Sequence, residues 1–118
     1  SSRGSLVALA VADRPVGVDI EVLDGTIDVV DDILHVNERA ELSGLRGERL
    51  RERFLQIWTA KEAFLKALGS GLTIDPARVA VDIRRGDVHV RHGETEGRGL
   101  LRAFDLEDKR CQVACILL

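Results

Sequence analysis

The chain has 118 residues, of which 45% are hydrophobic and 31% are charged, a balance that is typical of one folded globular domain and not of a disordered segment. Its formal net charge of −3 argues against a general nucleic-acid binder, which would carry a basic surface. No apolar run approaches the roughly 20 residues that a membrane helix needs, and no secretory leader is recognisable, so we expect a cytoplasmic protein without nucleic-acid or membrane partners.

The first third of the chain predicts strands and short helices. Residues 5–12 are rich in Leu, Val and Ala and predict a buried strand, followed by a tight turn at residues 13–15 and a second strand over residues 15–22. The short turn predicts that these two strands form an antiparallel hairpin. Residues 28–35 predict an amphipathic helix with acidic residues near its start. Asn37 is placed to cap a short helix over residues 38–42.

The middle of the chain predicts one long helix over residues 48–68, because its apolar residues recur at a helical period and Gly69 is a natural stop. Four more strands are predicted after it, over residues 79–83, 88–90, 99–106 and 112–118. This order of strands, then helices, then strands indicates an α+β fold, an antiparallel sheet with one long helix packed across it.

The two cysteines, Cys111 and Cys115, lie in the last predicted strand. Four strand steps of roughly 3.3 Å would separate them by about 13 Å, which is too far for a disulfide. We therefore expect both thiols to be reduced and mostly buried, as is common in a cytoplasmic protein.

Two motifs about forty residues apart carry the functional prediction. Residues 16–21 read Val-Gly-Val-Asp-Ile-Glu, and on a strand Asp19 and Glu21 would share one face while the alternating apolar residues point into the core. Residues 58–66 read Trp-Thr-Ala-Lys-Glu-Ala-Phe-Leu-Lys, and on a helix Glu62 and Lys66 would project side by side. Two acids from a strand and one from a helix make an oxygen-rich corner that suits Mg²⁺.

These motifs resemble those of the 4′-phosphopantetheinyl transferases, and more narrowly of the C-terminal half of the Sfp-type members. That pattern reads roughly [VI]-G-[VI]-D-[IV]-E, then W-[TS]-x-K-E-[AS]-x-x-K, then G-x-G-L, and all three occur here in the same order. The resemblance covers nearly the whole chain and implies that residues 1–118 form a single half-domain of the family fold. It further implies a second half-domain, supplied by a longer chain or by an oligomer.

The resemblance also implies an activity: Mg²⁺-dependent transfer of the 4′-phosphopantetheine arm of coenzyme A to a serine of an apo acyl or peptidyl carrier protein, with release of 3′,5′-adenosine bisphosphate. The family's metal ligands correspond to Asp19, Glu21 and Glu62. Lys66 corresponds to the phosphate-facing lysine, and Glu62 and Lys66 are the candidate catalytic residues. We expect the three carboxylates to face solvent, so that replacing them leaves the core intact.

Coenzyme A contacts are implied in the same way. Family members usually carry a histidine just before the first motif, and Ser1 or Ser2 stands at that position here. Ser1, Ser2, Lys61 and Lys66 are therefore the candidate coenzyme A contacts. For Lys61 two alternatives remain open: its ammonium reaches the phosphates, or its stem packs on apolar neighbours while its ammonium reaches water.

Other interpretations remain alongside these. Glu62 and Lys66 could form an ordinary exposed ion pair, worth about 0.3–0.5 kcal/mol. The whole chain could be a catalytically inactive homologue that serves as a carrier-protein interaction module. A basic cluster at the start of the long helix is either a docking patch for acidic carrier proteins or a solvated helix face; it comprises Arg46, Arg49, Arg51 and Arg53.

Overall fold

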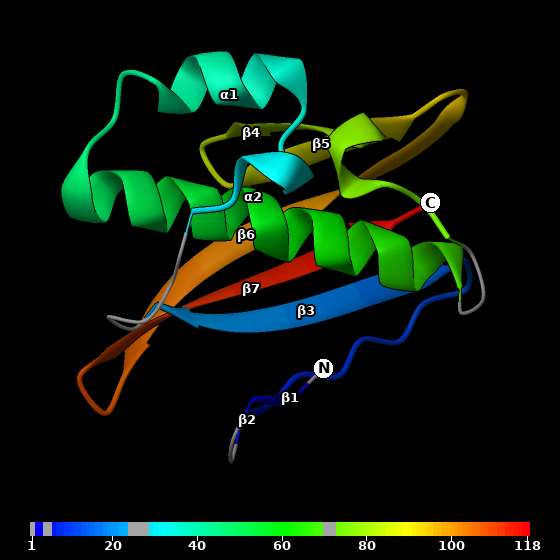
Figure 1. The fold of residues 1–118 in the computed structure, drawn as a ribbon. Coiled ribbons are helices and arrows are strands. Elements are labelled where there is room, and N and C mark those ends of the chain that lie inside the picture. Colours follow the sequence, from blue (N-terminus) through cyan, green and yellow to red (C-terminus); the bar gives the residue numbers. More distant parts are fainter. Residues whose placement is uncertain (1, 4–5, 24–28, 70–72) are drawn as a thin grey trace.

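The computed structural model describes residues 2–3, 6–23, 29–69 and 73–118. It contains a five-stranded antiparallel sheet with helices packed on one face (Figure 1). The strands follow the order β3-β7-β6-β5-β4, so that β3 and β4 form the two edges. Their bounds are β3 Val16–Leu23, β4 Ala80–Arg84, β5 Asp87–His92, β6 Thr95–Leu106 and β7 Lys109–Leu117.

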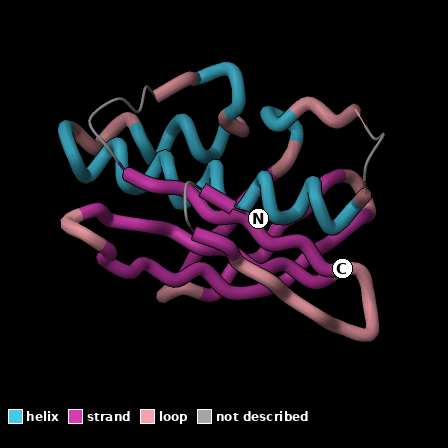
Figure 2. Tube along the Cα trace, turned by 90° about the horizontal axis from the view of Figure 1, so that it is seen from below, coloured by secondary structure: helices cyan, strands magenta, loops and turns pink. Residues whose placement is uncertain are grey.

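The long helix α2 (Gly47–Leu68) packs mainly over β3 and β7. The shorter helix α1 (Val36–Leu42) and the 3-10 turns η1 (Asp31–Ile33) and η2 (Pro76–Arg78) lie on the same side of the sheet (Figures 1 and 2). The predicted α+β architecture, an antiparallel sheet with one long helix across it, is confirmed. None of the helices in the described ranges is both long enough and apolar enough to cross a membrane.

The hydrophobic core lies between α2 and the sheet. Each large side chain that is fully buried there stabilises the fold by about 1.5–3 kcal/mol. The helix contributes residues at its 3.6-residue period, and the strands contribute every second residue. The central members are Phe54, Ile57 and Phe64 from α2, and Val88, Val90, Leu101, Ala114 and Ile116 from the sheet.

The N-terminal segment differs from the prediction of a buried strand over residues 5–12. Two-residue strands β1 (Ser2–Arg3) and β2 (Leu6–Val7) pair with each other, and the segment runs beside β3 on the side away from α2 (Figures 1 and 2). Leu9 and Val11 are 87% and 89% exposed. The predicted hairpin is also wrong, because residues 8–15 form no strand and the partner of β3 in the sheet is β7. A continuous apolar run carries no signal for its pairing partner, which explains the error.

The predicted helix over residues 28–35 is reduced to the single 3-10 turn η1, with Asp28 outside the described residues. The β-branched residues Val29, Val30 and Ile33 disfavour a helix, and Val30 offers no side-chain cap. The cap of α1 was also predicted two residues too late. His35, not Asn37, occupies the cap position, and it forms a capping box with Glu38.

Candidate active site

The two sequence motifs meet where β3 lies under the C-terminal half of α2. Gly17 makes this approach possible, because a Cβ atom there would meet the backbone of Ala63 and Ala67. The strand and the helix run in opposite directions. Residue 17 contacts the end of α2, whereas Leu23 pairs with Arg110, which is ion-paired to Glu52 near the start of α2.

The direct link between the motifs is an ion pair between Asp19 and Lys66. The Lys66 Nζ donates to Asp19 Oδ1 at 2.8 Å. The lysine side chain is 45% exposed while the aspartate is 1% exposed. Lys66 therefore pairs with the strand, and the expectation of a solvent-facing carboxylate is wrong for Asp19: it lies under α2, because its strand face is the one that the helix covers.

The predicted strand faces are reversed as a consequence. Asp19 is paired with Ala114, a member of the core between α2 and the sheet. Val18 and Ile20 lie on the opposite face, where Ile20 is 3% exposed yet does not belong to that core. The alternation of the strand was predicted correctly, but a sequence does not state which face a helix will cover.

Glu21 and Glu62 complete the predicted corner, and both are partly exposed. Glu21 lies two residues after Asp19 on the same strand face. Glu62 lies one turn before Lys66 on the same helix face. Because β3 and α2 run in opposite directions, the stretch of strand from Asp19 to Glu21 lies along the stretch of helix from Lys66 to Glu62. β3 is an edge strand, so this corner lies at the margin of the five-stranded sheet.

The donor chemistry of this corner fits Mg²⁺. Within the described residues, no three His, Cys, Asp or Glu side chains are already gathered around one metal position. Mg²⁺ does not require such a cage, because it retains water and binds one or two carboxylates together with substrate phosphates. The aspartate and the two partly exposed glutamates supply ligands of that kind.

Lys61 does not belong to this corner, and both alternatives considered for it are wrong. Its ammonium is fully buried, and it contacts Glu38 Oε1 at 2.7 Å and the carbonyl oxygens of Ile33 and Pro76 at 2.6 and 2.7 Å. Burial lowers the pKa of Lys61 below its ordinary value, against the raising effect of the Glu38 carboxylate. Its ammonium is thus used to join α2 to η1, α1 and η2, and is not exposed to a phosphate or to water.

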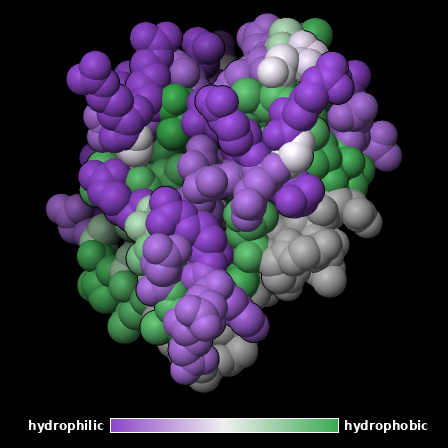
Figure 3. Space-filling model, turned by 90° about the vertical axis from the view of Figure 1, so that its left-hand side faces the viewer, coloured by the Kyte–Doolittle hydropathy of each residue, from purple (hydrophilic) through white to green (hydrophobic). Residues whose placement is uncertain are grey.

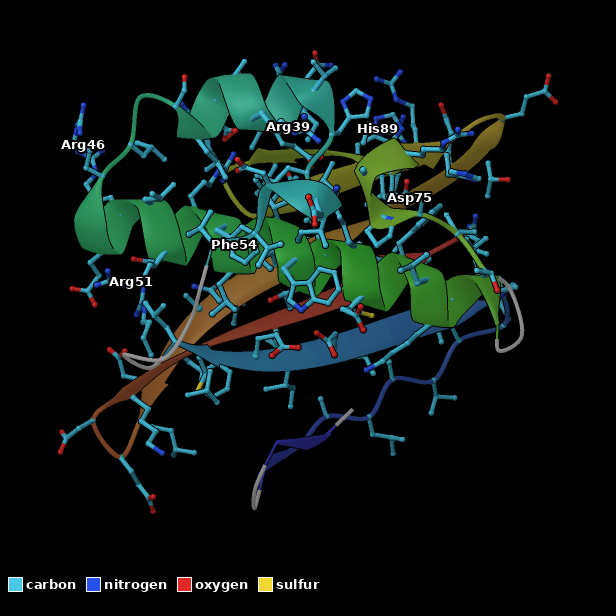
Figure 4. All side chains as sticks on the ribbon, in the orientation of Figure 1. Arg39, Arg46, Arg51, Phe54, Asp75 and His89 are labelled. Atoms are coloured by element: carbon cyan, nitrogen blue, oxygen red, sulfur yellow. The ribbon has the colours of Figure 1, made fainter. Side chains whose placement is uncertain are left out.

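The remaining predicted residues lie elsewhere. Ser1 is outside the described residues, and Ser2 begins β1. In the basic cluster, Arg46 and Arg51 extend outward from the N-terminal end of α2, away from the corner (Figure 4). Arg53 instead folds onto its neighbours and donates to Glu41 at 2.6 Å.

Two buried polar residues were missed by the sequence reasoning. Glu38 is 3% exposed and accepts hydrogen bonds from the backbone of His35 and Val81 in addition to its contact with Lys61. Gln112 is fully buried on β7, directly opposite Glu21. A glutamate in a short helix and a glutamine in a strand both resemble ordinary surface residues, and no local pattern distinguishes them.

The sequence of the chain is similar to a known protein family and to several of its members. Residues 15–114 match the sequence model of the 4′-phosphopantetheinyl transferase superfamily. A 4′-phosphopantetheinyl transferase of Bacillus subtilis is 27% identical over 118 residues, covering 98% of this chain and 52% of that protein. A holo-[acyl-carrier-protein] synthase of Bacillus thuringiensis (strain Al Hakam) is 34% identical over 79 residues, covering 61% of this chain and 66% of that protein. The chain thus spans less than two thirds of the length of these curated relatives.

Solved structures show the same fold. A holo-(acyl-carrier-protein) synthase from Bacillus anthracis str. Ames has a TM-score of 0.60 at 25% identity, covering 86% of this chain and 94% of that one. The holo-[acyl-carrier-protein] synthase of Thermotoga maritima has a TM-score of 0.60 at 22% identity, covering 86% and 62% respectively.

Proposed function

Because the chain belongs to the 4′-phosphopantetheinyl transferase superfamily, we propose that it transfers the 4′-phosphopantetheine arm of coenzyme A to a serine of an apo acyl or peptidyl carrier protein. The observation that carries the proposal is the ion pair between Asp19 and Lys66, which joins the two motifs at an edge strand of the sheet. Relatives that carry the names of this activity support it, as does the Bacillus anthracis synthase, whose structure is described as a complex with coenzyme A (3′,5′-ADP).

Asp19, Glu21 and Glu62 would hold Mg²⁺ at this corner. When bound there, the metal supplies charge neutralisation and orientation of the pyrophosphate of coenzyme A. Lys66 is held by a buried carboxylate and is half-exposed, so its ammonium can meet a phosphate oxygen while it remains anchored.

The reaction needs a proton acceptor and compensation of charge on the leaving group. The serine oxygen of the carrier protein attacks the β-phosphorus of coenzyme A, and the bond from that phosphorus to the bridging oxygen breaks, which releases 3′,5′-adenosine bisphosphate. Glu62, which is partly exposed, takes the serine proton directly or through one water. Lys66 stabilises the charge that develops on the phosphates.

A second half-domain is part of the proposal. The chain covers 52% of the Bacillus subtilis transferase, and the corner lies at β3, an edge strand of the five-stranded sheet. Ligand sites are common at such interfaces between domains. We expect another copy of this chain, or another segment of a longer polypeptide, to cover the coenzyme A that is bound there.

The test is transfer to an apo carrier protein, followed by intact-mass measurement. The purified chain, coenzyme A and Mg²⁺ should increase the mass of the carrier protein by one phosphopantetheine, and a carrier protein whose acceptor serine is replaced by alanine should gain nothing. If the carrier protein is bound but its mass stays unchanged, even with the chain at micromolar concentration, the chain is an interaction module and the proposed activity is wrong.

A further inference from the structure

A second pocket lies on the other side of α2 from the Asp19–Lys66 corner. It is an open depression with a volume of about 390 Å³, lined by residues of the N-terminal half of α2, of β4 and its turn to β5, of β6 and by one residue of β7. No residue of β3 lines it. The end of the molecule where α2 begins is covered mainly by hydrophilic side chains with apolar patches between them (Figure 3). We propose that this pocket binds a phosphate group.

Positive charge is the first argument for this proposal. Three arginines line the pocket, and no aspartate or glutamate does. The side chain of Arg53 is already held by Glu41, which offsets its charge. Arg85 makes no side-chain hydrogen bond or ion pair within the described part of the chain, and Arg102 has no acidic partner there either. The pocket therefore carries two cationic side chains that no acid neutralises.

Two of the three arginines, Arg53 and Arg102, are held in place by hydrogen bonds. Arg102 Nη1 donates to the carbonyl oxygens of Gly86 at 3.1 Å and Leu101 at 2.8 Å. The Leu101 amide donates to the same Gly86 carbonyl at 2.8 Å, which ties the β4–β5 turn to β6. Across the pocket, Arg53 is fixed by hydrogen bonds to three different acceptors. A ligand would thus enter a site whose walls are already ordered, which lowers the entropic cost of binding.

The second argument is Gln112, which lines the pocket and is fully buried. Neither its Nε2 nor its Oε1 has a hydrogen-bond partner in the described structure. A buried amide without a partner is costly, and such groups are rare in folded proteins. The amide has almost no exposed surface, so a ligand would reach it only by displacing the side chains that cover it. A phosphate oxygen would then accept a hydrogen bond from the Nε2 group, which would remove part of this cost.

Charge and size together favour a phosphate monoester over other anions. Two guanidinium groups match a phosphate dianion better than a singly charged carboxylate, and the arginine fork fits phosphate oxygens in pairs. A water molecule takes about 30 Å³ in the liquid, and a phosphate ion takes the space of only a few waters. The pocket volume of about 390 Å³ is therefore larger than inorganic phosphate requires. Apolar side chains fill the rest of the wall, namely Ile83, Leu101 and Ala103. They would contact a small organic group that carries the phosphate.

The experiment measures binding to the chain alone, without coenzyme A, Mg²⁺ or carrier protein, so its result does not depend on the proposed transfer activity. Isothermal calorimetry with inorganic phosphate and with glycerol 3-phosphate, against chloride at matched ionic strength, should show saturable binding of both phosphates, tighter for the monoester. Arg85→Gln should weaken this binding roughly tenfold, because one charge-assisted hydrogen bond is lost. Arg84→Gln is the control, since Arg84 carries the same charge one residue away and does not line the pocket.

Gln112→Leu separates ligand binding from folding. It removes the buried amide, so the thermal midpoint of the chain should stay the same or rise while phosphate binding weakens. Equal weakening by Arg84→Gln and Arg85→Gln would show that phosphate senses only the overall charge of this end, and would overturn the proposal. Binding no different from chloride, or phosphate binding unaffected by both Arg85→Gln and Gln112→Leu, would overturn it as well.

Discussion

At the scale of single residues, the candidate site depends on a carboxylate that is buried and a lysine that is half-exposed. The 1% exposure of Asp19 means that its charge is compensated inside the protein, in part by Lys66. A buried carboxylate in contact with an exposed cation is well placed to exchange part of that contact for a metal ion and its phosphate ligands.

Because Asp19 is buried, its test must preserve shape. Asp19→Asn keeps the size of the side chain but removes the negative charge of one proposed Mg²⁺ ligand. We expect it to lower the rate of transfer by roughly 10²–10³-fold. Turnover should be measured over a wide range of Mg²⁺ concentrations, with the far-ultraviolet circular dichroism of the variant as the folding control. Wild-type turnover at saturating Mg²⁺ in this variant would disprove the assignment.

Lys66 should affect both catalysis and stability. Lys66→Ala leaves the buried Asp19 without its lysine contact, so the free energy of unfolding should fall by about 1–3 kcal/mol. Turnover should fall further than this loss explains, because the phosphate-facing charge is gone. Lys66→Arg keeps the charge and should restore stability more fully than turnover. Urea denaturation measures the stability of each variant, and the transfer assay measures its turnover. Unchanged turnover in Lys66→Ala would make Lys66 a structural residue.

The sequence predicted which residues would come together, but not how deeply they would lie. Local periodicity placed Glu62 beside Lys66 on one helix face, whereas the meeting of Asp19 with the helix was predicted from the two motifs taken together. The burial of Lys61 depends on Glu38, which is distant in the sequence and belongs to another helix. A contact of that kind is set by how whole elements pack, and no local pattern encodes it.

At the scale of elements, the approach of α2 to β3 is set by Gly17. Gly17→Ala places a Cβ atom against the backbone of Ala63 and Ala67, which has no flexible end that can yield. We expect the free energy of unfolding to fall by at least about 1–3 kcal/mol. Turnover should also fall, because the shift of α2 moves Lys66 away from Asp19. Gly44→Ala is the matched control, because a Cβ atom at Gly44 meets nothing within 4 Å. Equal stability of the two variants would contradict this interpretation.

The buried pair of Glu38 and Lys61 holds the helical layer together, since the lysine also contacts η1 and η2. Lys61→Met should cost about 3–5 kcal/mol, because it leaves the Glu38 carboxylate buried without its cation. Adding Glu38→Gln to Lys61→Met should recover part of that loss. Urea denaturation of Lys61→Met, Glu38→Gln and the double variant gives a double-mutant cycle. Strictly additive losses in the free energy of unfolding would show that the two side chains are not coupled.

At the scale of the whole molecule, the N-terminal segment presents apolar side chains to solvent. Leu9 and Val11 are among the most exposed large hydrophobic residues in the described part of the chain. The sequence predicted this segment as a buried strand, and the prediction failed. An apolar run is equally compatible with a strand and with a surface that contacts another subunit. The strands that do form the sheet were predicted to within a few residues, since they alternate or are separated by clear turns.

This exposed segment and the edge strand β3 both favour association with another chain or domain. We expect the 118-residue chain to self-associate at micromolar concentration unless a longer polypeptide supplies the second half. Sedimentation velocity over a range of concentrations should show the association, and Leu9→Ser combined with Val11→Ser should weaken it. A strictly monomeric chain that still binds coenzyme A tightly and transfers its arm would show that no second half is needed.

The pairing of β3 with β7 also has a consequence for how the protein is made. Asp19 lies opposite Ala114, about 95 residues later in the chain, so the strand that carries the acidic residues has no sheet partner until the final strand has been synthesised. Contacts of such long sequence separation form slowly, because a large loop must close first. During translation β3 therefore lacks its sheet partner while α2 is already complete. We therefore expect the site to be completed late in folding, when β7 pairs with both β3 and β6.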